Sequence, residues 1–464
     1  MNYSKLFDEF INETVRECPY ATEEELKEVA IDMLNILNSN KDATPEEYVE
    51  KVIESDIDEM ERLRNDYLLP GYTMGINVGN INVKYLGGNM DSFGTKMKAD
   101  AMYDIASMSK MYTQVVLFNL IKEGQIRLDD KISDLDTRFS KIGDVSIREL
   151  SEFKVEFMTP GNITNMENIE DAKEALFNIE IAKYPDGNLK RGKYFYTDFG
   201  MMILKEVMEA VTNKKYTDLV DEYITNKLSL FNTKIIVPTE KYDLLTGSPN
   251  VKYGTVNDPK AIAVGGYSGH AGVFASSDDL IKFGKGLEDG TLLDNNDLEK
   301  ANTKGIKDNR GIMGNTYVVT PEGLDNSYIE TISNSSDFAI QGSTRTHLNI
   351  GKDSVSTILL NPSSLSIKEA LEEQERINEM RKIQAQKDNK EFIPISIVKH
   401  FKFNRDGKAL EYDMVDARSL LNYRQVDPLT TMNAKTSLKL RFLSKVISEY
   451  DKNYTKKVEV SKSI

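Results

Sequence analysis

The sequence predicts an α+β fold in which an antiparallel sheet is flanked by helices, with a helical subdomain and a helical extension at the N-terminus. Amphipathic helical spacing dominates the first 69 residues, and β-rich segments follow on both sides of Gly79-Asn80. Further strand patterns return at 344–360, after a mainly helical middle. A sheet built from strands at both ends of the core, with helices between them, satisfies this order.

The charge of the chain is uneven. The 464 residues carry a net charge of −15, and residues 1–69 hold 7 Lys+Arg against 19 Asp+Glu, which is −12 of that total. Nucleic acid and anionic lipid bind clustered Lys and Arg, so this acidity argues against both partners. We expect an acidic helical extension at 1–69, a core at 70–361, a charged insertion at 362–431, and at 432–464 a tail with a helix that returns to the core.

The extension is expected to hold three helices. Leu6 to Val15 has apolar residues at helical spacing, Thr22 with Glu25 forms a capping-box pattern before a second helix, and Thr44 opens a third. Their apolar stripes favour a small bundle or a brace against the core. A contact with a protein partner or a second copy is the alternative that stays open.

In the core, Gly79-Asn80 joins the strand patterns Tyr72–Val78 and Ile81–Leu86 as a hairpin, and a helix is expected over Ser107–Glu123. The other expected elements are helices near 200–211 and 216–227, strands at 344–350 and 355–360, a charged helix at about 366–388, and a last amphipathic helix at about 438–446.

The sequence indicates neither a cleavable leader nor a membrane span. The opening residues lack the basic and apolar regions of a signal peptide, and no apolar run is long enough to cross a bilayer. The single cysteine, Cys18, cannot form an intrachain disulfide, which fits a reducing compartment. We therefore expect a cytoplasmic protein.

Ser107-Met-Ser-Lys110 places a serine and a lysine three residues apart at the start of the expected helix, on one face of it. A serine hydroxyl needs a neighbouring base, and a lysine can be that base when burial lowers its pKa. The motif alone also fits an ordinary helix start with an exposed lysine. The residues around it decide between the two interpretations.

The stretch from Tyr103 to Lys110, followed by an apolar helix that ends at Glu123-Gly124 and by Leu128-Asp-Asp, resembles the nucleophile helix of class C β-lactamases. That family belongs to the serine β-lactamase and penicillin-binding-protein superfamily, with D,D-carboxypeptidases, D-aminopeptidases and β-lactamase-like esterases. The resemblance implies a β-lactamase/transpeptidase-like fold whose helical subdomain carries Ser107 as nucleophile and Lys110 as base.

A second element of the superfamily is a Tyr-x-Asn or Tyr-x-Asp triplet, and Tyr196-Thr-Asp198 matches it. The resemblance implies that the Tyr196 phenol shares proton transfer with Lys110 and that Asp198 holds Lys110 and the substrate. A further segment, Gly265 to Leu280, resembles the family's G-H-A-G-L-F-S-x-x-D-D-L signature. We expect its His270 to support the site from behind, and Ser277 or Asp278 to cap the next helix.

The third catalytic element of the superfamily is a strand with Lys-Thr-Gly or His-x-Gly, and here it falls at Ile340-Gln341-Gly342. The glycine is present and the basic residue is not. Gly342 still allows close approach of the backbone, so the N–H groups of Ser343 and Ser107 would form an oxyanion hole, with Gln341 lining the substrate site. Residues 151–154 depart from the family's next turn as well, which alters the rim of the site.

Other chemistries are less well supported. A Ser-His-Asp triad would need one of the three histidines, His270, His347 or His400, but the G-x-S-x-G elbow is absent. Neither metal-ligand spacing nor a nucleotide motif is present, so we expect no metal and no cofactor. The sequence thus predicts a serine hydrolase, of the esterase or peptidase type, acting through an acyl-enzyme on a small ester, amide or peptide. The alternative is a non-catalytic relative that binds a peptide or a partner protein.

Overall fold

The protein is described here from a computed structural model. The description covers residues 5, 7–12, 23–66, 70–91, 93–193, 195–247, 251–293, 346–351, 353–360, 364–387, 389–394, 401–411, 414–416, 432, 435–436 and 438–448. The positions predicted at Cys18, Thr22, His400 and 340–343 lie outside these residues.

The central element is a four-stranded antiparallel sheet with the order β2-β1-β9-β8. Its strands are β1 (Gly71–Val78), β2 (Ile81–Gly88), β8 (Thr346–Gly351) and β9 (Ser354–Leu360). The β1–β2 hairpin turns at Gly79, whose φ of 57° suits glycine, and Val78 pairs with Ile81. Strands from both ends of the core therefore meet in one sheet, which confirms the predicted α+β class.

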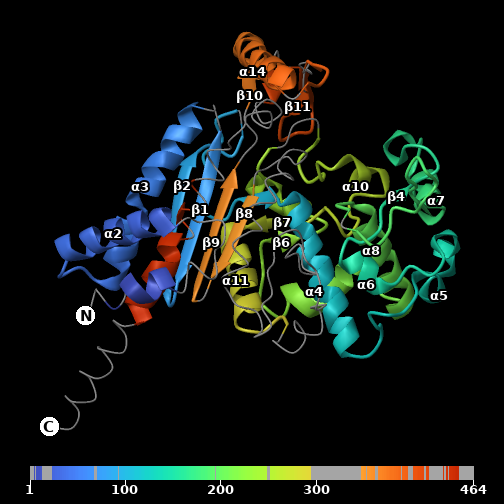
Figure 1. The fold of residues 1–464 in the computed structure, drawn as a ribbon, viewed down its shortest axis with the longest axis horizontal. Coiled ribbons are helices and arrows are strands. Elements are labelled where there is room, and N and C mark those ends of the chain that lie inside the picture. Colours follow the sequence, from blue (N-terminus) through green and yellow to red (C-terminus); the bar gives the residue numbers. More distant parts are fainter. Residues whose placement is uncertain are drawn as a thin grey trace, which may run out of the picture.

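Helices cover both faces of this sheet (Figure 1). One face packs on α11 (Ser277–Glu288), which the absence of a side chain at Gly75 allows to approach β1 closely: a Cβ there would lie 2.2 Å from Ser277 Oγ. The other face packs on α2 (Glu23–Ser39), α3 (Pro45–Asp66) and the helical residues 438–448.

The side chains of the strands alternate between two apolar cores, as the period of a β-strand requires. Val355 and Leu359 of β9 belong to the core shared with α11, whereas Ile358 and Leu360 belong to the core shared with α2 and α3. The helices of the N-terminal extension therefore contribute their apolar faces to a core that includes the sheet.

Two further contacts tie the N-terminal helices down. Thr44 opens α3 as predicted, and with Glu47 it forms a capping box that the sequence analysis had not assigned: Glu47 N–H donates to Thr44 Oγ1 (3.3 Å) and Thr44 N–H to Glu47 Oε2 (2.8 Å). Lys439 Nζ, in the C-terminal helical segment, forms an ion pair with the buried Asp56 of α3 (2.6 Å).

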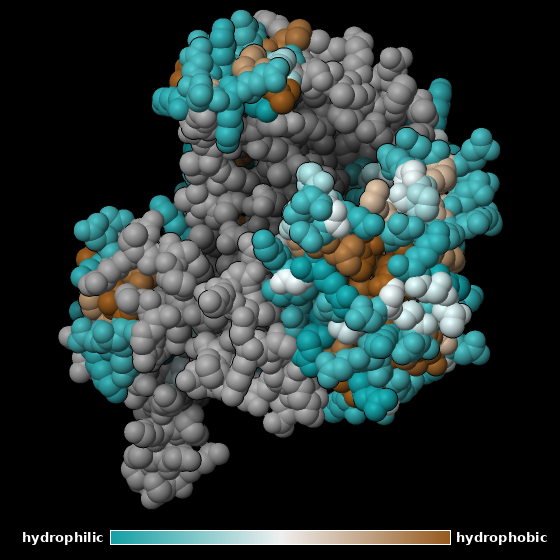
Figure 2. Space-filling model, turned by 45° about the vertical axis from the view of Figure 1, so that its right-hand side comes forward, coloured by the Kyte–Doolittle hydropathy of each residue, from teal (hydrophilic) through white to brown (hydrophobic). Residues whose placement is uncertain are grey.

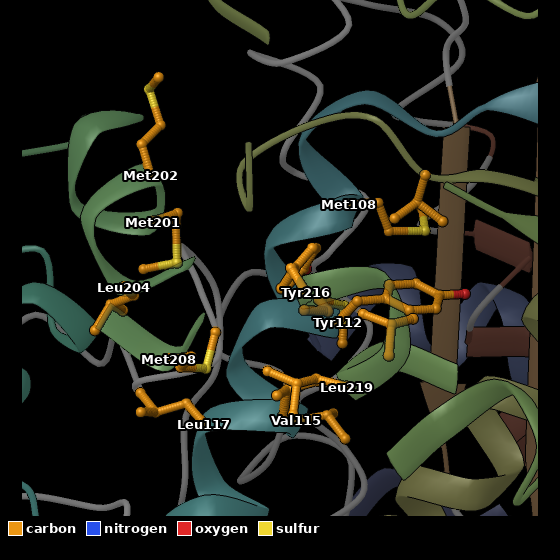
Figure 3. Close-up of a cluster of buried hydrophobic side chains, with 14 of the residues drawn as sticks. Met108, Tyr112, Val115, Leu117, Met201, Met202, Leu204, Met208, Tyr216 and Leu219 are labelled. Atoms are coloured by element: carbon orange, nitrogen blue, oxygen red, sulfur yellow. The ribbon is translucent and has the colours of Figure 1, made fainter. Parts of the chain in front are cut away.

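The helix α4 (Ser109–Lys122) runs through the second core. Its residues from Ser109 to Leu120 are all buried, which is expected of a helix that is enclosed on every side. Figure 3 shows Tyr112, Val115 and Leu117 of α4 among apolar side chains of the neighbouring helices. The Tyr112 ring also stacks on Phe283 of α11, with centroids 4.4 Å apart. This packing fixes the N-terminal end of α4.

The remaining elements lie between β2 and β8 in the chain or follow the sheet. Between β2 and β8 the helices, besides α4 and α11, include α5 (Ile132–Leu135), α6 (Ile147–Ser151), α7 (Ile169–Phe177), α8 (Phe199–Thr212), α9 (Tyr216–Val220) and α10 (Pro259–Ala263), of which α8 and α9 pack on α4. The short strands there are β3 (Met102–Asp104), β4 (Phe157–Met158), β5 (Glu180–Ile181), β6 (Thr233–Lys234) and β7 (Phe274–Ser276). The later segment contains β10 (Ser364–Ser366), α14 (Ile367–Lys387), β11 (Phe401–Phe403), β12 (Ala409–Glu411) and β13 (Met414–Asp416).

Two local expectations differ in detail from the structure. The helix predicted over 216–227 is present, but it is α-helical only as α9, to Val220, and continues as a wider π-type turn over Asp221–Thr225, in which Asn226 N–H donates to Asp221 O (3.0 Å). The cap of α11 is Ser276, one residue before the predicted position, because its side chain accepts from Asp279 N–H.

The coloured surface in Figure 2 is mostly hydrophilic, with hydrophobic residues gathered near the middle of its right-hand part. Within the part of the chain that the structure describes, we find no helix with the length and apolar character that crossing a membrane requires.

Candidate active site

Ser107 lies in a tight turn between β3 and α4. The preceding residue, Ala106, has a φ of 49°, a left-handed conformation that is uncommon for alanine. The buried Asp104 holds this turn, because its carboxylate oxygens accept from Ala106 N–H (2.9 Å) and from Asn257 N–H (2.8 Å). A constrained turn thus presents the half-buried Ser107 at the start of α4.

Lys110 lies one turn further along, on the same side of the helix as Ser107. Its side chain is buried, and Lys110 Nζ donates to Ser107 Oγ at 2.7 Å. Burial lowers the pKa of the Lys110 ammonium below its ordinary value, and the opposing effect of Asp198 does not restore it. The predicted Ser-Lys pair is thus in contact, and burial favours the neutral amine.

Tyr196 approaches the same hydroxyl from the segment before α8. Its phenol donates to Ser107 Oγ at 3.2 Å, and Lys110 Nζ lies 4.9 Å from the centre of its ring. The ring also stacks on Phe153, with centroids 5.7 Å apart, which fixes its plane. Ser107 Oγ therefore has an amine and a phenol within hydrogen-bond distance.

Asp198 is shared between two lysines. Its Oδ1 lies 2.9 Å from Lys110 Nζ, and its Oδ2 lies 2.8 Å from Nζ of Lys260, on α10. Burial acts to raise the pKa of this carboxyl, but the charges of Lys110 and its other neighbours outweigh burial and hold the pKa well below its usual range. Asp198 is accordingly an ionised anchor between two ammonium groups.

His270 lies behind this cluster and is fully buried. Its Nε2 bonds to Asp258 Oδ1 (2.9 Å) and its Nδ1 to Ser268 Oγ (2.8 Å). Asp258 in turn caps α10, because the same oxygen accepts from Ala261 N–H (2.9 Å). This chain of contacts reaches the position of Lys260.

The segment with the G-H-A-G signature is packed against α4. Gly269 and Gly272 have φ values of 78° and 113°, and a Cβ at Gly269 would lie 2.5 Å from Met201 O. Thr113 Oγ1 donates to Gly269 O (2.6 Å), and Val273 N–H donates to Ser109 Oγ (3.1 Å). Gly269 thus allows the segment to approach α8 closely, and the two hydrogen bonds hold it against α4, the helix that carries Lys110.

Among the described residues, one group of acidic residues and histidine is close enough to hold a metal ion. The ligand atoms of Asp198, Asp258 and His270 lie within 4.8 Å of one another. Both oxygens of Asp198 are already bonded by ammonium groups, and two such charges oppose the binding of a cation. We therefore interpret this group as an ion-pair network.

The third predicted element is not part of this geometry. Ile340, Gln341, Gly342 and Ser343 lie outside the described residues, so the predicted oxyanion hole stays a prediction. Conversely, sequence reasoning missed Lys260 and Asp104. The pattern Asp258-Pro-Lys260 does indicate the start of a helix, because aspartate is a preferred cap and proline a preferred first residue. That signal locates Lys260 on a helix but gives no indication of its partner.

Residues 55–342, more than half of the chain, match the Beta-lactamase family model. The chain belongs to the beta-lactamase family. This confirms the superfamily membership predicted from the motifs around Ser107 and Tyr196, and members of the family similar to this chain are hydrolases by name.

Two curated relatives of this beta-lactamase-family chain are similar over less than half of its length. One is named "Putative D-alanyl-D-alanine carboxypeptidase", from Salmonella gallinarum, with 26% identity over 42% of this chain and 53% of the relative. The other is an N-acetylmuramyl-L-alanine amidase of Bacillus subtilis, with 27% identity over 42% of this chain and 52% of the relative. The chain thus spans about half the length of the curated relatives it matches.

Among solved structures, FmtA from Staphylococcus aureus has a similar fold. The match has a TM-score of 0.51 at 18% sequence identity, and it covers 71% of this chain and 90% of FmtA. At this identity the likeness establishes the fold alone.

Proposed function

We propose that the chain is a serine hydrolase that forms an acyl-enzyme on Ser107, with Lys110 and Tyr196 as its general base and acid. The main support is the pair of contacts at Ser107 Oγ, which lies 2.7 Å from Lys110 Nζ and 3.2 Å from the Tyr196 phenol. A buried lysine with a lowered pKa is the state in which an amine can accept the serine proton.

In the proposed reaction, the neutral Lys110 amine accepts the proton of the Ser107 hydroxyl while Oγ attacks the substrate carbonyl. The tetrahedral intermediate collapses, the bond to the leaving group breaks, and the leaving group takes a proton by way of the Tyr196 phenol. Water, deprotonated by the same pair, then attacks the acyl-enzyme; the bond from Ser107 Oγ to the acyl carbon breaks, the acid leaves, and Lys110 returns the proton to Ser107 Oγ. Asp198 stays ionised throughout and holds Lys110 in place.

The proposed substrates are small esters, amides or peptides. The names of both curated relatives describe the cleavage of amide bonds, which supports an amide or peptide substrate. The sequence motif Ile340-Gln341-Gly342 lacks a basic residue for a substrate carboxylate. We therefore propose weak activity on nitrocefin and on peptides ending in D-Ala-D-Ala, and better activity on neutral esters.

The alternative is a non-catalytic relative that binds a peptide or a partner protein. A binding protein has no need of an amine, a phenol and a hydroxyl in mutual contact, nor of a buried lysine at the site. The described geometry therefore favours catalysis over this alternative.

The test compares kcat/KM for nitrocefin, a D-Ala-D-Ala peptide and a p-nitrophenyl acyl ester, in the wild type and in Ser107→Ala. A charge-assisted hydrogen bond contributes about 1.5–3 kcal/mol, so its absence should cost about ten- to a hundredfold on the two carboxylate substrates. Introducing a base with Ile340→His should recover part of this loss. Equal turnover of the ester by Ser107→Ala and wild type would refute the proposal.

Two further parts of the proposal concern the setting of the protein. We place it in the cytoplasm because Cys18 is its single cysteine, and fractionation of cells would test this. Residues 1–69 would contact a partner or a second copy through the charged outer sides of α2 and α3, since their apolar sides pack into the core with the sheet. Ultracentrifugation of the full chain and of a variant with Glu28→Lys and Asp32→Lys, two exposed positions of α2, would test the second part.

A further inference from the structure

We propose that Lys260 is a positioning residue that keeps Lys110 able to act as a base by holding the second oxygen of Asp198. This inference rests on the proposed function, because it concerns the protonation of the same lysine. The observation behind it is a carboxylate bridged by two ammonium groups, with Lys110 on Oδ1 and Lys260 on Oδ2.

A buried carboxylate beside a single lysine would favour the charged ammonium and so oppose the role of that lysine as a base. At this site Asp198 divides its charge between two lysines, each at hydrogen-bond distance. The second ammonium also adds a positive charge close to Lys110. Both effects favour the neutral amine at Lys110.

The side chain of Lys260 is placed by the start of a five-residue helix, α10. Asp258 caps this helix through Ala261 N–H, Pro259 occupies its first turn, and His270 bonds the capping carboxylate. The aliphatic part of Lys260 is partly covered, with a side-chain exposure of 29%. The lysine therefore lies at the edge of the buried cluster, with its ammonium directed inward.

The charged and titratable groups that face Lys110 come from several elements. Ser107 is on its own helical segment, Tyr196 and Asp198 precede α8, and Asp258 and Lys260 belong to α10. Asp198 and Asp258 act to raise the pKa of Lys110, whereas burial and Lys260 act to lower it. Lys260 is thus the neighbouring cation that offsets the two carboxylates.

The test is the pH dependence of acylation in Lys260→Met. Loss of the cation should raise the pKa of Lys110, so the rising limb of kcat/KM should move to higher pH by about one unit. At a pH below both midpoints the rate should fall about tenfold, because it follows the fraction of neutral Lys110. Lys260→Arg retains the charge and should restore the wild-type midpoint.

The matched control is Lys98→Met, which removes the lysine of another ion pair, Lys98–Asp243 (2.6 Å). This change should leave the midpoint of the kcat/KM profile unchanged. Lys260→Gln provides a second neutral variant in case Lys260→Met folds poorly. A limb that stays in place, or moves to lower pH, in a folded neutral variant would overturn the proposal.

A readout without turnover separates this inference from the proposed function. In protein labelled with ¹³Cε-lysine, the Lys110 signal, assigned with Lys110→Arg, should titrate at higher pH in Lys260→Met than in the wild type. If Ser107→Ala acylates like the wild type while this shift is observed, the proposed function fails, but the effect of Lys260 on the protonation of Lys110 stands. If the titration is unchanged, the role of Lys260 fails whatever the activity.

Discussion

At the scale of single residues, the properties of the site depend on Asp198. This carboxylate forms ion pairs with Lys110 and Lys260, and it lies in a position with little access to water. Charges interact strongly where water is excluded, so a change at Asp198 should be transmitted directly to the titration of Lys110.

Asp198→Asn should therefore lower the pKa of Lys110 further, which is the opposite of the effect expected from removing Lys260. In the wild type, kcat/KM should rise with pH through a midpoint below the ~10.4 of free lysine. In Asp198→Asn that midpoint should move to lower pH, and the plateau should fall because Lys110 is held less firmly. A pH series of ester hydrolysis measures both, and a midpoint that moves upward would contradict the account.

Asp104 should matter for both folding and acylation. Removing its carboxylate in Asp104→Ala leaves the partly buried backbone N–H groups of Ala106 and Asn257 without this acceptor. The free energy of unfolding should fall by about 1–3 kcal/mol, and acylation should slow by at least about tenfold as the turn before Ser107 loosens. Asp104→Asn retains one acceptor oxygen, so its loss of stability and of acylation rate should be smaller. Denaturant melts and probe labelling measure the two effects, and wild-type values for both would refute this role.

The sequence identified residues whose relation is local or belongs to a motif, and missed those that depend on tertiary contacts. Ser107 and Lys110 are three residues apart on one helix, so their contact follows from helical geometry. Lys260 meets Asp198 only because a short helix, 62 positions away, is capped at one particular place. Hydrophobic periodicity says nothing about such a contact, so it could not be predicted.

At the scale of elements, the segment after the sheet is fastened to the core by a hairpin. Arg405 lies in the turn between β11 and β12, and its guanidinium donates to Tyr242 O (2.8 Å), Leu245 O (3.2 Å) and Asp91 Oδ2 (3.3 Å). It also lies over the ring of Tyr253, 4.8 Å from the centroid. The turn thus places one guanidinium group, with several N–H donors, among carbonyl groups and a buried carboxylate.

Arg405→Ala should release this hairpin. Asp91 has a side-chain exposure of 2% and would lose its cation, so the free energy of unfolding should fall by about 1–3 kcal/mol. Amide hydrogen exchange should accelerate over residues 401–411. Arg405→Lys retains the charge without the planar guanidinium, so its free energy of unfolding and its exchange rates should lie between those of the wild type and Arg405→Ala. Unchanged exchange in that segment of Arg405→Ala would show that the contact does not hold the hairpin.

The elements of the core were predictable where burial imposes a regular period. The β1–β2 hairpin follows from Gly79-Asn80 and the two apolar strands beside it, and α4 follows from a continuous apolar stretch. The change from α9 to a π-type turn after Val220 was missed. This change lengthens the spacing of the backbone hydrogen bonds by one residue and leaves the apolar pattern of the sequence intact.

At the scale of the whole molecule, helices from the N-terminal and C-terminal parts of the chain pack into one core with the sheet. Apolar residues of α2, α3 and the helical residues 438–448 pack together on the outer face of the sheet. The stability of the sheet, and through it of the helices that carry the site, should therefore depend on residues far from Ser107.

Two substitutions on α2 test this dependence. Leu26 is fully buried in the shared core, so Leu26→Ala should lower the free energy of unfolding by about 2–5 kcal/mol. Ile31, on the same helix, is 50% exposed, and Ile31→Ala should change stability by no more than about 0.5 kcal/mol. Denaturant unfolding measures both. Similar values for the two variants would mean that α2 is not part of the cooperative core.

The central claim, an acyl-enzyme on Ser107, is tested most directly by the mass of the intact protein after brief exposure to a p-nitrophenyl acyl ester or a serine-directed fluorophosphonate. The account predicts one added group on the wild type, located by peptide mapping on the peptide that contains Ser107, and none on Ser107→Ala. It also predicts slower labelling of Lys110→Met, because the serine then lacks its base. Labelling of Ser107→Ala to the same extent as the wild type, or no labelling of the wild type by either reagent, would contradict it.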